Sequence, residues 1–174
     1  MTRVAQSPAG AGAGEAPRQP KLIVDLEGID LGGKVLSRTD LERWNPHRGP
    51  FVQLDGVVWT LPDFSQGVGV KHVRDDEFWV AGHFPGRPMM PGVLMVEAGA
   101  QLASYLYYSR IGAPCIAGFT RIENTVFRGK VVPGDDLYLL CREVKYRPRL
   151  FISDVQGIVE GRLVFESRIT GMVM

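Results

Sequence analysis

The pattern of hydrophobic and polar positions divides the chain into several extended runs and one helical segment. After residue 50, apolar residues mostly alternate with polar ones or form short stretches between turn signals, which is typical of β-strands. We predict six strands, at Phe51–Trp59, Gln66–Val73, Ala117–Phe127, Leu137–Lys145, Leu150–Val159 and Arg162–Val173. Turn residues such as Pro133-Gly134-Asp135 separate the last four, which are therefore expected to form an antiparallel meander.

The segment Met90–Tyr108 breaks this rhythm and is predicted to be a helix. Pro91 suits the first turn of a helix, where a missing N–H removes no hydrogen bond. The apolar residues of the segment point in nearly every direction around the helix axis, and a helix that is apolar all round is buried. The predicted fold class is therefore α+β, with an antiparallel sheet of five to seven strands wrapped around one long central helix.

The N-terminal part of the chain differs in composition. Residues 1–20 are rich in alanine, glycine and proline and carry too little apolar surface to fold, so we predict a disordered tail. Residues 21–174 are predicted to form a single domain that begins with a short N-terminal extension. Within it, Thr39 and Asp40 are suitable for the start of a short helix that ends near Trp44.

Composition and charge exclude several classes of function. Of the 174 residues, 45% are hydrophobic and 22% are charged, which is typical of a soluble globular protein. No apolar run approaches the ~18–20 residues of a membrane span, and no secretory signal is recognisable, so a cytoplasmic protein is expected. A net charge of +1 gives no basic footprint for nucleic acid. Cys115 and Cys141 have neither C-x-x-C spacing nor a histidine cluster beside them, so we expect buried, reduced thiols and no metal site.

Two polar residues, Glu97 and Gln101, interrupt the apolar helix. They are four positions apart and therefore lie one turn from each other on one face. A buried carboxyl group is costly unless it is hydrogen-bonded, and Gln101 can supply one such bond. Either the pair belongs to a chemical site inside the protein, or this face is a solvated or interface stripe.

The segment before the helix, Gly82–Gly92, favours a chemical site. It is dense in glycine and proline, so it is expected to form a stiff loop that brings His83 ahead of the helix start. Gly92, in the first turn, exposes backbone N–H groups that have no partner within the helix, and such groups stabilise a developing oxyanion. A histidine, a buried glutamate and helix-start donors are the parts required for proton transfer next to a carbonyl group.

The run from Gly82 to Gln101, GHFPGRPMMPGVLMVEAGAQ, closely resembles the signature of the bacterial 3-hydroxyacyl-[acyl-carrier-protein] dehydratases of the FabZ type. Three weaker matches occur in the order that the family has. NPHRGPF at residues 45–51 resembles its PHRYPF segment, DDEFW at residues 75–79 its acidic-aromatic lead, and VPGD at residues 132–135 its PGD turn. The resemblance covers the chain from about Leu41 to the C-terminus.

This resemblance implies a hotdog fold, in which a curved antiparallel sheet surrounds a long helix, and an active site at the interface of a dimer, often packed as a trimer of dimers. It implies that His83 is the general base and acid, that Glu97 of the neighbouring subunit is the partner acid, and that Gln101 orients it. The N–H groups of Gly92 and Val93 would bind the thioester carbonyl. The implied reaction converts (3R)-hydroxyacyl-ACP to trans-2-enoyl-ACP in type II fatty-acid synthesis, without a cofactor.

The resemblance also implies a tunnel for the acyl chain and a basic surface for the acidic acyl carrier protein. Apolar side chains that are candidates for the tunnel, although each also fits an ordinary core, are Leu94, Met95, Ala98 and Phe119. Basic side chains that are candidates for carrier docking, although such charges are usually a solvated face, are Arg128, Lys130, Arg142, Lys145, Arg147 and Arg149.

The chain departs from the family pattern at two places. Gly49 stands where the family has a tyrosine, so the substrate entrance is expected to differ, and the extension Lys21–Arg38 is longer than the minimal form of the family. Two alternatives to a dehydratase are a hotdog acyl thioesterase, which does not need the pair of His83 and Glu97, and a non-catalytic hotdog subunit that binds acyl carriers.

Overall fold

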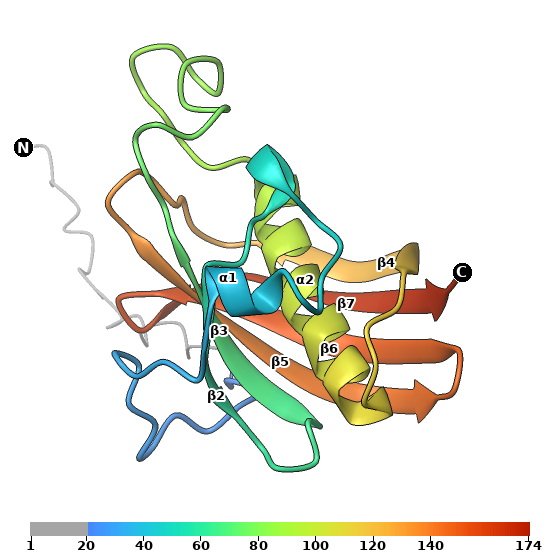
Figure 1. The fold of residues 1–174 in the computed structure, drawn as a ribbon. Helices are drawn as coiled ribbons and strands as arrows, with labels where there is room; N and C mark the ends of the chain where they lie inside the picture. The colour runs from blue at the N-terminus through green and yellow to red at the C-terminus, as the bar shows by residue number, and fades with distance from the viewer. Residues whose placement is uncertain (1–20) are drawn as a thin grey trace, which may run out of the picture.

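The computed structural model describes residues 21–174; the tail predicted for residues 1–20 lies outside the described residues. One seven-stranded antiparallel sheet curves around a 20-residue helix, α2 (Gly92–Ile111) (Figure 1). The strands are β1 (Leu36–Ser37), β2 (Gly56–Thr60), β3 (Gln66–His72), β4 (Ala117–Phe127), β5 (Asp136–Arg147), β6 (Leu150–Val159) and β7 (Arg162–Val173). The predicted α+β hotdog architecture is confirmed.

The predicted four-strand meander is wrong in one respect. Strands β5, β6 and β7 pair in sequence order, but β4 pairs with β7 and not with β5. The order across the sheet is β1-β2-β3-β5-β6-β7-β4. The cause is α2, which follows β3 and crosses the concave face of the sheet. The chain therefore re-enters the sheet at the opposite edge, as β4. Residues 128–135 then lead back to β3, beside which β5 pairs. Strand β4 is therefore an edge strand, and most of its residues are exposed.

Helix α2 fills the concave face of the sheet and forms the centre of the core. It begins directly after Pro91 and ends at Gly112, whose φ of 81° is a left-handed conformation that glycine adopts without strain. Every residue from Met95 to Tyr108 except Glu97 is buried. The prediction of a helix buried on nearly all sides is confirmed. Glu97 is the one residue between Met95 and Tyr108 that is not buried.

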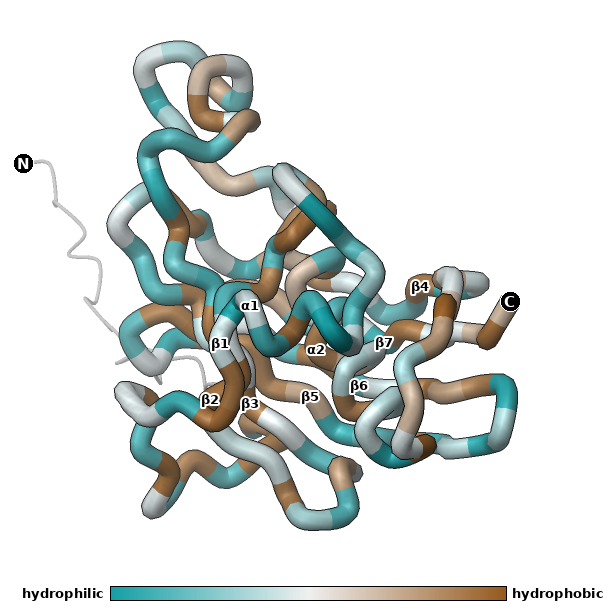
Figure 2. Tube along the Cα trace, in the orientation of Figure 1, coloured by the Kyte–Doolittle hydropathy of each residue, from teal (hydrophilic) through white to brown (hydrophobic). Residues whose placement is uncertain are grey.

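The N-terminal extension covers the outer face of the sheet. Six residues of β2, β3, β5, β6 and β7 form an apolar cluster there: Val58, Val68, Val70, Leu140, Ile158 and Leu163. Val24 of the extension is 1% exposed within this cluster, and the N–H group of Ile23 donates to Gln156 Oε1 of β6 at 2.9 Å. Figure 2 shows hydrophobic positions alternating with hydrophilic ones along the extension. A sheet with apolar residues on both faces must bury both, and the extension covers the second face.

The short helix before β2, α1 (Arg38–Leu41), begins two residues earlier than the sequence indicated. Its N-cap is Ser37 and not Thr39, because Ser37 and Asp40 form a capping box in which each side chain bonds the other's backbone N–H group. The helix is a single turn and ends before Trp44. It lies against β1 and brings Arg38 toward the end of α2 that carries the candidate site.

Two further features of the described range bear on the sequence predictions. Among residues 21–174, no helix combines the length and the apolar character that crossing a membrane requires. Cys141 on β5 is a buried free thiol, and burial raises its pKa to about 12. Cys115, after α2, is a free thiol that is only half-buried.

Candidate active site

The candidate site is built around the start of α2 from two segments that are far apart in sequence. One is the connection from β3 to α2, residues 73–91, which projects from the body of the molecule in Figure 1 and is called the His83 loop here. The other, residues 45–54, runs along α2 and is called the wrapping segment. A strand was predicted from Phe51, but residues 49–51 form the 3₁₀ turn η1 (Gly49–Phe51) and β2 begins at Gly56. The reason is that the backbone of residues 51–54 bonds a side chain of α2.

Hydrogen bonds within the His83 loop fix both the backbone and the ring of His83. Its N–H group donates to Trp79 O at 2.8 Å, and its carbonyl accepts from Met89 N–H at 2.8 Å. Its Nδ1 lies 2.7 Å from Met89 O. A carbonyl oxygen can only accept, so Nδ1 of His83 carries the proton of the neutral ring. Nε2 is therefore an unprotonated nitrogen that can accept a proton.

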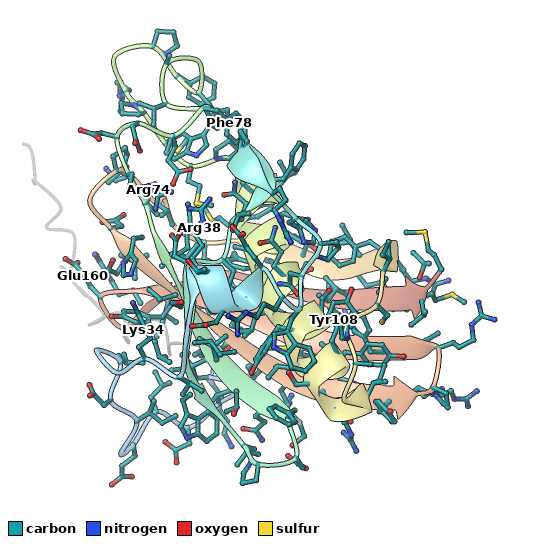
Figure 3. The ribbon with its side chains drawn as sticks, in the orientation of Figure 1. Lys34, Arg38, Arg74, Phe78, Tyr108 and Glu160 are labelled. Atoms are coloured by element: carbon teal, nitrogen blue, oxygen red, sulfur yellow. The ribbon has the colours of Figure 1, made fainter. Side chains whose placement is uncertain are left out.

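A buried group of charges fixes the base of the His83 loop. Lys71 on β3 is 0% exposed and pairs with Glu77 of the loop and, at 3.6 Å, with Asp55. The guanidinium group of Arg74 lies 3.3 Å from a carboxylate oxygen of Asp55 and 3.3 Å from one of Glu77. The guanidinium group of Arg38, in α1, lies 3.0 Å from Asp55. Figure 3 shows Arg38 and Arg74 between α1 and the stem of the loop. These five residues are called the anchor cluster; each buried charge within it has a partner of opposite sign, which its burial requires.

The first turn of α2 presents free hydrogen-bond donors. Within residues 21–174, the N–H groups of Gly92 and Val93 have no hydrogen-bond partner, whereas the next two N–H groups bond to Pro91 O. Such groups, together with the positive end of the helix dipole, attract an oxygen anion. Gly92 also lies against the ring of Phe127, since a Cβ at this position would come within 2.7 Å of that ring. A larger residue at position 92 would displace the aromatic ring that borders these donors.

Gln101 is buried, and its side chain makes four hydrogen bonds. Oε1 accepts the N–H groups of Gln53 at 2.9 Å and Leu54 at 3.1 Å. Nε2 donates to Phe51 O at 2.6 Å and to Glu97 Oε1 at 2.8 Å. Both amide protons and both oxygen lone pairs are therefore used, which fixes the orientation of the amide. Through Gln101, the carboxylate of Glu97 is tied to the wrapping segment.

Glu97 is only partly buried, with 24% of its side chain exposed, where the sequence indicated a buried residue. The reason is that this side of α2 is covered by the wrapping segment and not by the sheet. His47 of that segment lies with Nε2 3.3 Å from Glu97 Oε1. Sequence reasoning missed His47 as a site residue. Its motif was visible, but the contact spans 50 positions and depends on the path of an irregular segment.

His83 and Glu97 are not brought together within one chain. No hydrogen bond or ion pair joins them among residues 21–174: the ring of His83 bonds within its own loop, and Glu97 bonds to Gln101 and lies at ion-pair distance from His47. In the same range, no group of three or more histidine, cysteine, aspartate or glutamate side chains is arranged to hold a metal ion.

The tunnel candidates lie in two separate places. Met95 and Ala98 are buried in the first turns of α2, and Leu94 packs beside them. Phe119 lies near the start of β4, the end of that strand opposite Phe127, and is 40% exposed. Only the three helix residues are therefore close to the start of α2.

The docking candidates also separate into two groups. Arg128 and Lys130 follow β4, and Arg128 pairs with Glu166 of β7. Lys130 lines a largely apolar groove of about 560 Å³ together with Phe84, Pro88, Met89 and Val132. Arg142 pairs with Asp154 on β6 at 3.3 Å. Three more lie toward the opposite end of the sheet, beyond the C-terminal half of α2: Lys145, Arg147 and Arg149.

Comparison with known proteins gives a family match and several relatives. The model of the FabA-like domain matches residues 45–168 of the chain. The 3-hydroxyacyl-[acyl-carrier-protein] dehydratase FabZ of Acidiphilium cryptum is 36% identical over 153 residues, which cover 86% of this chain and 92% of that protein. The protein of the same name from Rickettsia africae is 38% identical over 141 residues, covering 80% of this chain and 97% of that protein.

A solved structure shares the fold at much lower sequence identity. The dehydratase heterocomplex ApeI:P from Xenorhabdus doucetiae aligns with a TM-score of 0.66 and 14% identity, covering 77% of this chain and 90% of that one. At this identity the likeness concerns the fold alone. It agrees with the arrangement of one sheet around one long helix that α2 and the seven strands form.

Proposed function

This chain belongs to the FabA-like family, and on that premise we propose that it is a hydro-lyase that converts (3R)-hydroxyacyl-ACP to trans-2-enoyl-ACP in type II fatty-acid synthesis. The observation that carries the proposal is the set of groups at the start of α2. They comprise an imidazole with a free Nε2, two unpaired backbone donors and a carboxylate held by an amide. These are the groups that removal of water from a 3-hydroxyacyl thioester requires.

The proposed mechanism uses each group once. Nε2 of His83 removes a proton from the carbon next to the thioester carbonyl, while the N–H groups of Gly92 and Val93 stabilise the charge that develops on the carbonyl oxygen. A protonated Glu97 gives its proton to the hydroxyl group on the β-carbon. The C–O bond breaks, a double bond forms between the α- and β-carbons, and water leaves. The proton on His83 then returns to Glu97 through solvent or product water.

A second copy of the chain is expected to complete the site, because His83 and Glu97 have no contact within one chain. We infer a dimer in which the free edge of β4 pairs with the same strand of the second copy, with further association to a trimer of dimers. Strand β4 exposes Ile122, Val126 and Phe127 at 52%, 41% and 49%. An unpaired strand edge with exposed apolar side chains is a ready template for pairing.

The first test is dehydration of 3-hydroxyacyl-ACP substrates of several chain lengths, followed by mass spectrometry for the loss of water. We expect the wild type to form the enoyl product and His83→Ala and Glu97→Gln each to lose at least ~10³-fold in kcat/KM, since each removes a proton-transfer group. His72→Ala is the matched control, because the side chain of His72 is exposed and, among residues 21–174, pairs with Asp136 alone. Release of the free acid would instead indicate a thioesterase, and carrier binding without turnover a non-catalytic subunit.

The same two variants test whether the site is shared between two copies. In a dimer of His83→Ala with Glu97→Gln, one of the two shared sites keeps both groups. Random mixing of the chains should therefore restore about a quarter of wild-type activity. Mixing would restore nothing if both groups of a site came from one chain.

The carrier protein is proposed to dock beside the His83 loop, at Arg128 and Lys130. Both are exposed, although Arg128 pairs with Glu166 of β7. Lys130 lines the groove together with Phe84 and Met89 of the His83 loop, whereas Arg147 and Arg149 lie toward the other end of the sheet. Arg128→Gln with Lys130→Gln should raise KM for the ACP substrate by roughly three- to tenfold, because rim charges mainly steer association. KM for a short thioester without a carrier should stay unchanged, and Arg147→Gln with Arg149→Gln should alter neither. Equal effects of the two pairs would contradict this placement.

A further inference from the structure

We propose that His47 is a positioning residue for Glu97. Its Nε2–H group and the Nε2–H group of Gln101 converge on one carboxylate oxygen, Oε1, and thereby present the other oxygen, Oε2, to the departing hydroxyl group. The inference concerns a contact that the family signature around His83 and Glu97 does not contain. It rests on the proposed function only for its activity measurements.

The approach of two side-chain nitrogens to one carboxylate oxygen is the central observation. Gln101 Nε2 lies 2.8 Å and His47 Nε2 lies 3.3 Å from Oε1 of Glu97. Among residues 21–174, no hydrogen bond or ion pair reaches Oε2. The two oxygens of the carboxyl group are therefore not equivalent. Oε1 accepts the hydrogen bond of Gln101 and lies at ion-pair distance from His47, whereas Oε2, which has no partner within the described residues, is available to carry the proton that the reaction transfers.

The surroundings of His47 favour one tautomer of its ring. Nδ1 is inaccessible to solvent and has no hydrogen-bond partner among the described residues. A proton on this buried nitrogen would be an unsatisfied donor, which is costly, so the neutral form with the proton on Nε2 is favoured. The charged groups around the ring are Glu97 of α2 and, lining the same small cavity, Arg38 of α1 and Glu42, which directly follows α1. His47 thus has the opposite tautomer to His83, whose Nδ1 carries the proton.

The position of His47 is fixed by bonds on both sides of it. The side chain of Asn45 donates to the carbonyl of Gln101 at 3.0 Å, which ties the start of the wrapping segment to α2. Arg48 donates to the carbonyl oxygens of Asn45 at 2.9 Å and of His47 at 2.7 Å. After it, Phe51 accepts from Gln101, as described above. The imidazole therefore approaches the carboxylate from a backbone that is already held, and little further entropy is lost on making the contact.

This arrangement has a direct chemical use in the proposed reaction. When Oε2 gives its proton to the hydroxyl group, the O–H bond at Oε2 breaks, the C–O bond of the substrate breaks, and Glu97 is left with a negative charge. Part of this charge develops on Oε1, which already accepts the hydrogen bond of Gln101 and has the imidazole of His47 beside it. Donors that are in place before the charge develops stabilise it without reorganisation.

Steady-state kinetics with the full chain and the ACP substrate test the activity side of the inference. His47→Ala should lower kcat by roughly 10- to 100-fold, the range expected for loosening a reacting group, and leave KM within about twofold. His47→Gln places an amide donor near the position of Nε2 and should recover most of the lost kcat. His72→Ala should match the wild type. An unchanged kcat in His47→Ala would overturn the proposal.

A double-mutant comparison separates positioning from a general structural role. In the Glu97→Gln background, His47→Ala should cause no further loss of kcat, because the residue through which it acts has already been disabled. A full additional loss in that background would show that His47 acts elsewhere and would overturn the proposal. Both variants should unfold at the same urea concentration as the wild type.

A spectroscopic measurement decides the contact without any turnover. The chain has only three histidines, so the ¹⁵N–¹H spectrum of the imidazole groups is simple and can be assigned with His47→Gln and His72→Ala. We expect His47 to show the Nε2–H tautomer and its Nε2 signal to move in Glu97→Gln, while the signals of His72 stay in place. An Nδ1–H tautomer, or an unmoved Nε2 signal, would overturn the proposal even if dehydratase activity is present. The expected signals would support the contact even if the wild type proved inactive.

Discussion

The two side chains that are proposed to transfer protons, His83 and Glu97, are held in opposite ways. His83 lies on a projecting loop, and its ring makes one hydrogen bond, to the backbone of the same loop. Glu97 lies on the central helix, and its carboxylate is held by a buried amide that is itself bonded to three positions of the wrapping segment. The anchor cluster, at the base of the His83 loop, holds this loop in place at some distance from His83 itself.

This difference reflects what each group must do in the proposed reaction. The base must reach a carbon atom of an incoming substrate, so it sits on an exposed loop beside an open groove. The acid must present its proton to the hydroxyl group in one direction, so it sits where its hydrogen bonds are defined in advance. A loop can be placed accurately only if its ends are firmly held, and here charges buried at the stem hold one end.

The largest effect is expected when the anchor cluster is broken. Lys71→Met leaves Glu77 and Asp55 with less compensation in a buried position, and should lower the free energy of unfolding by about 3–5 kcal/mol. Lys145→Met removes an exposed lysine of β5 and serves as the matched control, with less than about 0.5 kcal/mol expected. Urea denaturation measures both. Similar midpoints for the two variants would mean that the anchor cluster does not stabilise the loop.

A smaller loss is expected on the helix side. Gln101→Leu removes four hydrogen bonds and leaves the buried N–H groups of Gln53 and Leu54 without partners, which should cost roughly 2–3 kcal/mol of unfolding free energy. Gln66→Leu, at a half-buried position at the start of β3, is the control. Amide hydrogen exchange sharpens the contrast. Gln101→Leu should accelerate exchange of the amides in the wrapping segment, whereas Lys71→Met should accelerate exchange of the amides in the His83 loop. If both variants accelerated exchange of the same amides, the wrapping segment and the His83 loop would not be stabilised independently.

The smallest effect is expected at Gly49, in the wrapping segment. Its φ of 58° is in the left-handed region, and a Cβ there would meet no atom within 4 Å, so Gly49→Ala should cost only the backbone strain of about 1 kcal/mol. Gly49→Asn should cost less, because asparagine tolerates this conformation. Thermal unfolding followed by circular dichroism distinguishes the two. A larger loss for asparagine than for alanine would show that space, and not backbone conformation, is limiting at this position.

Sequence reasoning succeeded where the determining interactions are local. The pairing of Glu97 with Gln101 follows from helical spacing, and the helix from the apolar run that contains them. It failed where distant segments meet. The place of β4 beside β7 depends on the crossing of α2, and the contact of His47 with Glu97 depends on the path of the wrapping segment. The start of α1 was an avoidable error, because the spacing of Ser37 and Asp40 is itself a capping-box signal.

The packing of the N-terminal extension has a practical consequence for the preparation of this protein. The family match begins at residue 45, whereas the packed structure already includes Val24. A chain trimmed to the matched region would lose the cover over Val58, Val68 and Leu140 and would present a water-exposed apolar patch, the usual origin of poor solubility during expression. The unit that the family model matches is therefore smaller than the packed unit, and boundaries for recombinant production should be chosen from the second.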